Sequence, residues 1–146
     1  GAVLTGRNGR GKTTLLQLIP MFYGESPDRV LDKGANRKNF TEYYLERSTS
    51  YIVFEYRRRG QETRCVVLFA DKQNKLNYLF IRQAYDMGLF VQENNIIENI
   101  NLVKHLKISG LREFTILTKF QWTFKWSSDK LETCPIWLCY GFSSNI

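Results

Sequence analysis

Several residue types are scarce in this chain of 146 residues, and each scarcity excludes a class of protein. The three cysteines, Cys65, Cys134 and Cys139, are odd in number and lack the spacing of a zinc site, which indicates reduced thiols in a cytosolic protein. His105 is the only histidine, so we expect a surface position on a helix and no histidine metal cluster. The longest strictly apolar run, residues 66–70, is far shorter than the roughly 20 residues of a membrane span. The sequence predicts a soluble protein without membrane contact.

Acidic residues are outnumbered by basic ones. The chain has 21 Lys+Arg and 14 Asp+Glu, a net charge of +7, and residues 1–75 hold 14 of the basic residues and 8 of the acidic ones. With 43% hydrophobic and 14% aromatic residues, the chain can bury one core, which excludes an intrinsically disordered protein. The basic first half suits a nucleotide or a nucleic acid as partner, although similar charges occur on proteins that bind neither.

A phosphate-binding motif begins at the sixth residue. Residues 6–14 read Gly-Arg-Asn-Gly-Arg-Gly-Lys-Thr-Thr, which satisfies the complete G-x-x-x-x-G-K-[ST] pattern. The apolar residues 2–5 predict a buried strand before the loop, and the apolar spacing of residues 15–22 predicts a helix after it. Strand, loop and helix in this order are what such a phosphate site requires.

Each residue type in this loop suits the binding of a nucleoside triphosphate. Glycines let backbone N–H groups converge on a phosphate, and the following helix adds unpaired N–H groups and its positive dipole end. We expect Lys12 to reach the β- and γ-phosphates, Thr13 to ligate Mg²⁺ and Thr14 to bond the α-phosphate. The alternative is a glycine-rich turn that caps a helix and carries an incidental lysine. The candidate nucleotide-binding residues are Asn8, Gly9, Arg10, Gly11, Lys12, Thr13 and Thr14.

The order Asn8-Gly9 followed by Gly11-Lys12-Thr13 resembles the N-G-x-G-K-[ST] loop of ABC-type ATPases, especially the SMC, Rad50, RecF and MukB-like chromosome-maintenance proteins. The leucine pair at 15–16 and the aromatic-glycine end at 22–24 are similar to that family's helix. Arg10 departs from the family, which usually has a small residue there. The resemblance covers roughly residues 1–92 and implies binding of ATP with Mg²⁺, action on DNA in chromosome maintenance, repair or defence, and a cytoplasmic or nucleoid location.

The motifs that such an ATPase needs for hydrolysis are absent from this sequence. No apolar run ends in Asp with an adjacent Glu base, and there is no Ser-Gly-Gly signature or switch histidine. In the resembled family these elements lie in the C-terminal half of the head, and the signature acts on ATP held by a second head. The resemblance therefore implies a fragment, starting at Gly1, that needs a C-terminal lobe and a second head in a dimer.

The remaining chain predicts an antiparallel β meander after the first helix. Pro20 predicts a kink or an early helix end near Ile19. A turn is expected at 26–28, a basic loop at 33–38, a short helix or an irregular segment at 40–46 and an amphipathic helix at 95–107. Strands are expected at 50–57, 63–70, 77–84 and 89–92. The expected fold class is α/β (α+β), an ABC-type head lobe of the P-loop NTPases with strand, P-loop, helix, meander and C-terminal helix.

Further phosphate or DNA contacts are predicted at two basic segments. The resemblance makes Arg37 and Lys38 candidates, against the alternative of a solvated loop. At the predicted hairpin tip a run of arginines could contact DNA phosphates, or could simply keep a sheet edge soluble. Three aromatic neighbours of that run are expected to pack in the core rather than to stack on bases. The tip arginines are Arg57, Arg58 and Arg59, and the aromatic neighbours are Tyr51, Phe54 and Tyr56.

The chain is expected to divide into an ATP-binding lobe at 1–95, an amphipathic helix at 96–111 and a tail at 112–146. The tail shows no family resemblance and is either a divergent strand region or a non-native extension. By the resemblance, Gln121 is a candidate for the glutamine that senses Mg²⁺ and the attacking water. Two other functions stay open: a different P-loop NTPase or nucleotide kinase, and a non-catalytic basic module that binds nucleic acid.

Overall fold

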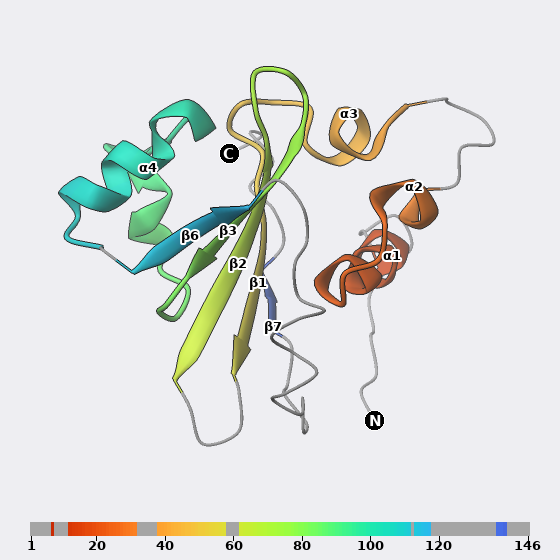
Figure 1. The fold of residues 1–146 in the computed structure, drawn as a ribbon, viewed down its shortest axis with the longest axis horizontal. Coiled ribbons are helices and arrows are strands. Elements are labelled where there is room, and N and C mark those ends of the chain that lie inside the picture. The colour runs from red at the N-terminus through yellow and green to blue at the C-terminus, as the bar shows by residue number, and fades with distance from the viewer. Residues whose placement is uncertain are drawn as a thin grey trace.

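Three layers make up the molecule in the computed structural model shown in Figure 1, which describes residues 7, 12–31, 38–57, 62–111, 113–117 and 137–139. Three helices lie on one side of a sheet: α1 (Lys12–Phe22), α2 (Pro27–Val30) and α3 (Phe40–Tyr44). The fourth, α4 (Asn99–Ile108), lies on the other side. The sheet contains β1 (Ile52–Arg57), β2 (Thr63–Ala70), β3 (Leu76–Ile81), β6 (Phe114–Leu117) and β7 (Trp137–Cys139).

The sheet is antiparallel throughout, in the order β6-β3-β2-β1-β7. The predicted meander is confirmed, because β1 pairs with β2 and β2 pairs with β3 in register through Phe54, Val66 and Phe80. The strand expected at 63–70 has those bounds, whereas β3 ends at Ile81 rather than at 84. The chain turns away there, although the Arg82 N–H still donates to the Glu113 carbonyl oxygen at 3.2 Å.

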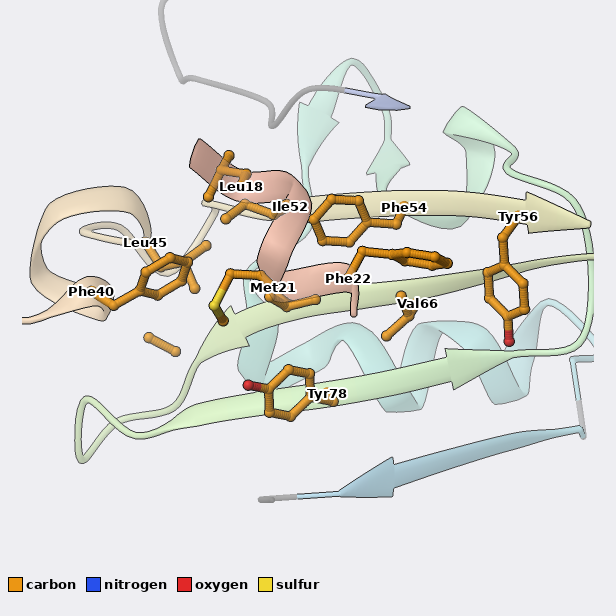
Figure 2. Packing of buried hydrophobic residues seen from close by; sticks show 12 residues of the cluster. Leu18, Met21, Phe22, Phe40, Leu45, Ile52, Phe54, Tyr56, Val66 and Tyr78 are labelled. Atoms are coloured by element: carbon orange, nitrogen blue, oxygen red, sulfur yellow. The ribbon is translucent and has the colours of Figure 1, made fainter. Parts of the chain in front are cut away.

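Both faces of the sheet are covered, so its central strands are apolar on both sides. Side chains alternate between the faces of a strand. On one face, Ile52, Phe54 and Val66 pack with α1 and α3, as Figure 2 shows for part of this cluster. On the other face, Val53 and Val67 pack with α4. The predicted core positions of the aromatic residues are confirmed, because Tyr51, Phe54 and Tyr56 are only 1%, 0% and 5% exposed.

The helix α1 continues through Pro20 to Phe22, so the early end predicted near Ile19 is wrong. Met21 and Phe22, which follow the proline, are 0% and 2% exposed, and their burial outweighs the backbone hydrogen bond that a proline lacks. Gly24, two residues past the end of the helix, has a φ of 85°. The N–H groups of Gly24 and Glu25 donate to the carbonyl oxygens of Met21 and Pro20, the Schellman pattern of helix ends.

Two further expectations about local structure need correction. The turn predicted at 26–28 is the start of α2, because Ser26 is the N-cap and Pro27 occupies the first helical position, where its ring is well tolerated. The helix expected from residue 95 begins only at Asn99. Residues Val91–Gln92 (β4) and Asn95–Ile96 (β5) instead pair as a small separate ribbon, after the 3₁₀ helix η1 at Met87–Leu89. The short helix expected at 40–46 is confirmed as α3.

The tail contributes strands to the sheet. Within residues 113–117 and 137–139, β6 pairs with β3 and β7 pairs with β1, which agrees with the strand interpretation for those two segments. In the described part of the chain, none of the helices has the length and apolar character needed to cross a membrane. Between α1 and α3, Val30 of α2 packs against the core cluster that contains Leu18 and Phe40.

Candidate functional site

The candidate nucleotide site lies at the first turn of α1. This helix begins at Lys12, directly after the last glycine of the motif, and its first turn contains no acidic residue. Thr13 is exposed and Thr14 is half-buried, so the Thr13 side chain is accessible to a ligand from solvent. Unpaired N–H groups and the positive dipole end at this turn favour a bound anion. Arg7 is exposed, while Asn8, Gly9, Arg10 and Gly11 lie outside the described residues.

Three buried side chains hold this helix against the sheet. Leu18, Met21 and Phe22 recur at helical spacing on one side of α1 and enter the core cluster, as Figure 2 shows. The Phe22 ring lies 5.5 Å from that of Phe54 and 5.6 Å from that of Tyr56, measured between ring centroids. These contacts are made by the second half of α1, so they hold the C-terminal end of the helix against the sheet.

The helix α3 supports α1 from the side. The Tyr44 hydroxyl donates to Oε1 of Gln17 on α1 at 3.0 Å. The Thr41 hydroxyl of α3 donates to the carbonyl oxygen of Asn74, in the turn between β2 and β3, also at 3.0 Å. A capping box of Asn39 and Glu42 closes the N-terminus of α3. The helix α1 is therefore linked through α3 to the hairpin of β2 and β3.

Of the phosphate contacts predicted outside the loop, the structure describes Lys38 and Arg57. Lys38 is exposed and directly precedes Asn39, the N-cap of α3. Arg57 is exposed at the end of β1, next to Tyr56, and Tyr56 contacts the last residue of α1. Arg57 therefore lies near the far end of α1 from Lys12, about 15 Å along the helix axis by its rise per residue. The other predicted contacts, Arg37, Arg58 and Arg59, and the candidate Gln121 lie outside the described residues.

An ion-pair cluster that the sequence did not predict lies at one end of the sheet. Arg82 pairs with Glu62 at 2.6 Å and with Glu113 at 3.0 Å, and Arg64 pairs with Glu62 at 3.2 Å. The hydrogen bond from Arg82 is the main cause that lowers the pKa of the Glu62 carboxyl, and the same bond raises the pKa of Arg82. The charges of the two arginines and the two glutamates cancel within the cluster. We therefore infer that the cluster helps to align the strands of the sheet. The residues are too far apart in sequence for a local pattern to reveal it.

Asp71 follows an apolar strand, but its carboxylate accepts hydrogen bonds within the turn between β2 and β3. Its Oδ1 accepts hydrogen bonds from the N–H groups of Gln73 and Lys75, both at 2.9 Å, and its Oδ2 accepts one from Asn77 Nδ2 at 3.1 Å. These bonds, led by that from Lys75, lower the pKa of Asp71. The next residue in sequence is Lys72, not a glutamate base. Asp71 is therefore a structural turn residue.

The other titratable side chains at the core are structural as well. Burial raises the pKa of Tyr78 to about 12. The Tyr51 hydroxyl donates to the Ile97 carbonyl oxygen, and burial is the main cause that raises its pKa. Cys65 is buried, and its Sγ donates to the Gln83 carbonyl oxygen at 3.1 Å. His105 lies on α4 as predicted and contacts the Gly88 carbonyl oxygen through Nε2. Within the described ranges, no three His, Cys, Asp or Glu side chains gather as a metal site.

Comparison with known proteins gives one curated relative and one family. The chain is 34% identical over 82 residues to the ATP-dependent lipid A-core flippase of Methylobacillus flagellatus. That match covers 56% of this chain but only 12% of the flippase, so the chain spans a small part of that relative's length. No solved structure matches the chain significantly. A family model matches residues 1–122, a range that includes the phosphate-loop motif and also residues 112–122, where the sequence suggested no resemblance. The chain belongs to the family described as "Protein of unknown function (DUF3584)".

Proposed function

We propose that this chain binds the triphosphate of ATP together with Mg²⁺ at the first turn of α1, as the N-terminal half of an SMC/Rad50-like ATPase head that acts on DNA. The observation that carries the proposal is the start of α1 at Lys12, directly behind a complete phosphate-loop motif at residues 6–14. The N–H groups in the first turn of a helix have no partners within the helix, so they can bind an anion such as a phosphate. The absence of an acidic residue from this first turn leaves the positive dipole end available to phosphate.

The residues of this turn fit the chemistry of a nucleotide with a divalent cation. Lys12 would neutralise the β- and γ-phosphates, and the exposed Thr13 would offer its hydroxyl to Mg²⁺. The half-buried Thr14 would bond an α-phosphate oxygen. Mg²⁺ keeps several waters and takes few protein ligands, which agrees with a single hydroxyl ligand from this chain. The name of the similar flippase states that this relative depends on ATP, which supports ATP as the nucleotide.

The solvent face of α1 supports a partner lobe over the nucleotide site. Leu16 on α1 and Tyr23, just past the end of α1, are 56% and 59% exposed and lie seven residues apart. Gln17 and Pro20, which are exposed between them, are uncharged. A partly apolar surface of this kind beside the proposed phosphate site is suited to burial under a second lobe. That lobe, and a second head in a dimer, would supply the carboxylates and signature residues for hydrolysis that this sequence lacks.

Two other functions have weaker support. A nucleotide kinase or another P-loop NTPase with parallel β-α units disagrees with the antiparallel pairing of β1, β2 and β3. A basic module that binds nucleic acid without a nucleotide has the exposed Lys38 and Arg57 in its favour. It would bind DNA with a strong dependence on salt and without ATP. The cytoplasm or the nucleoid is the location that an ATPase acting on DNA would have.

Equilibrium binding of a fluorescent ATP analogue tests the proposal. We expect Mg²⁺-dependent binding that Lys12→Ala weakens by about tenfold or more, because the substitution removes a charged contact to phosphate. Thr13→Ala is expected to remove the dependence on Mg²⁺. Lys72→Ala, at an exposed lysine in the turn between β2 and β3, is the matched control and should bind like the unchanged chain. Equal affinities of the Lys12→Ala and Lys72→Ala variants would contradict a site at α1.

The same preparation tests the need for a second lobe. We expect ATP to bind without measurable turnover, because no base for water is provided. Mg²⁺-dependent release of phosphate by the purified chain, abolished by Lys12→Ala, would show that the catalytic groups are already present. Binding of duplex DNA measured over a range of salt concentrations, with and without ATP, separates the ATPase from the nucleic-acid module.

A further inference from the structure

The contacts that α1 makes with the core cluster lie in its second half. Leu18, Met21 and Phe22 belong to this cluster, whereas the helix begins more than a turn earlier, at Lys12. Thr13, in that first turn, is exposed. The ends of a helix open more readily than its packed part, so a turn ahead of the core contacts is more stable when another element holds it.

A hydrogen bond from α3 reaches α1 between its first turn and its core contacts. The Tyr44 hydroxyl donates to Oε1 of Gln17 at 3.0 Å. Gln17 follows Thr13 by four residues, so the two side chains lie one above the other on the same face of the helix. Figure 2 agrees with this placement, because Leu45, directly after α3, lies beside Leu18 of α1. The Tyr44 hydroxyl therefore holds α1 one turn away from the proposed Mg²⁺ ligand.

The donor of this hydrogen bond is itself held in place. The Tyr44 side chain packs against the core cluster, with its ring centroid 5.0 Å from that of Phe40 and 4.7 Å from that of Tyr43. Phe40 is buried, and the Thr41 hydroxyl ties α3 to the Asn74 carbonyl oxygen in the turn between β2 and β3. The Tyr44 hydroxyl is therefore presented to Gln17 from a helix that is anchored to the sheet.

We propose that Tyr44 is a positioning residue of the nucleotide site, an inference that rests on the function proposed above. By holding Gln17, the Tyr44 hydroxyl keeps the first turn of α1 helical before a nucleotide arrives. The N–H groups of that turn then need no ordering when they bind a phosphate, and this preorganisation raises the affinity. Tyr44 acts through Gln17 rather than by touching the nucleotide.

The size of this effect follows from the exposure of the hydrogen bond. A side-chain hydrogen bond in contact with water contributes little net free energy, so we expect its loss to weaken nucleotide binding about threefold. The alternative role for the bond is a general stabilisation of the fold. The two roles differ in where they act: a general brace protects the whole of α1 from opening, whereas a bond at Gln17 protects the turn that precedes it.

Backbone hydrogen exchange in the full 146-residue chain, without nucleotide, separates these two roles. Tyr44→Phe keeps the ring and removes the hydroxyl. We expect about threefold faster exchange at the amides of Leu16 and Gln17, which close the first turn of α1, and no change at the amide of Phe22. Tyr43→Phe removes the hydroxyl of the neighbouring, exposed tyrosine and is the matched control, which should change none of these amides. An equal acceleration at all three amides, or none at the first two, would overturn the proposal.

Binding of a fluorescent ATP analogue with Mg²⁺ measures the consequence for the site. Tyr44→Phe should weaken binding about threefold, and Tyr43→Phe should not. Gln17→Leu removes the acceptor and should weaken binding by a similar factor. The double variant Tyr44→Phe/Gln17→Leu should bind no more weakly than either single variant, because both substitutions remove the same bond. Losses that add in the double variant, or equal affinities of Tyr44→Phe and Tyr43→Phe, would overturn the role of Tyr44.

Lys12→Ala, measured in the same series, separates a failure of this inference from a failure of the proposed function. A strong loss of affinity in Lys12→Ala together with no loss in Tyr44→Phe would leave the site in place and remove Tyr44 from it. Unchanged affinity in Lys12→Ala would overturn the proposed site itself, and the positioning role of Tyr44 with it.

Discussion

Asp71 and Lys12 show how differently two charged residues of one chain can be used. The Asp71 carboxylate accepts hydrogen bonds from Gln73, Lys75 and Asn77, so the turn between β2 and β3 already satisfies it. At the first turn of α1, by contrast, no acidic side chain accompanies Lys12. Buried polar groups in a fold are usually satisfied internally, and a positively charged turn without an internal anion is suited to an external one.

The contribution of Asp71 to stability is expected to depend on pH. Its hydrogen bonds lower its pKa below the ordinary value of 3.8, so the folded state favours the carboxylate. The stabilisation is therefore complete well above pH 3.8 and is lost as the pH falls through the lower, folded-state pKa. Asp71→Ala should reduce the free energy of unfolding at pH 7 by about 1 kcal/mol, because the carboxylate is partly exposed.

Urea unfolding of both chains at neutral and acidic pH measures this effect. The difference between the unchanged chain and Asp71→Ala should shrink between pH 7 and about pH 2.5, provided that both chains still fold there. Lys72→Ala, the next residue in the same turn, is the control and should show no such dependence. A difference that stays constant over this pH range would mean that Asp71 stabilises the turn without its charge.

At the scale of elements, the two sides of α4 are in opposite environments, one buried and one exposed. The inner side of α4 buries Leu102 and Leu106, while its outer side exposes Ile100 and Ile108. Leu102→Ala should reduce the free energy of unfolding by about 3 kcal/mol, the usual cost of a cavity in a packed core. Ile100→Ala, on the exposed side of the same helix, should change the free energy of unfolding by less than about 0.5 kcal/mol. Thermal unfolding measures both, and equal losses would mean that the outer side is also packed.

The sequence predicted those elements whose signals are local. The meander was predicted because strands at 50–57 and 63–70 alternate around a polar turn, and α3 was predicted from its own short pattern. The ribbon of β4 and β5 was missed, because its turn uses Glu93 and Asn94 at positive φ rather than a glycine. The start of α4 was therefore placed four residues too early. Pairing between distant segments, such as Arg82 with Glu62, has no local signature at all.

At the scale of the whole molecule, one three-layer body carries two separate surfaces. The helix α1 lies on one side of the sheet, and α4 lies on the other (Figure 1). The candidate site at α1 could be predicted from the sequence because its motif is contiguous. The exposure of Ile100 and Ile108 could not, because it follows only once the opposite side of α4 is known to be buried.

The central claim is that the phosphates of ATP bind at the first turn of α1. The most direct test is a titration of the isotopically labelled chain with Mg²⁺ and ATP, followed by the backbone amide shifts in NMR spectra. We predict the largest shifts at Lys12, Thr13 and Thr14, whose N–H groups would face the phosphates, and no comparable shifts in α4. Shifts at Lys38 and Arg57 without any change at the first turn of α1 would contradict the account.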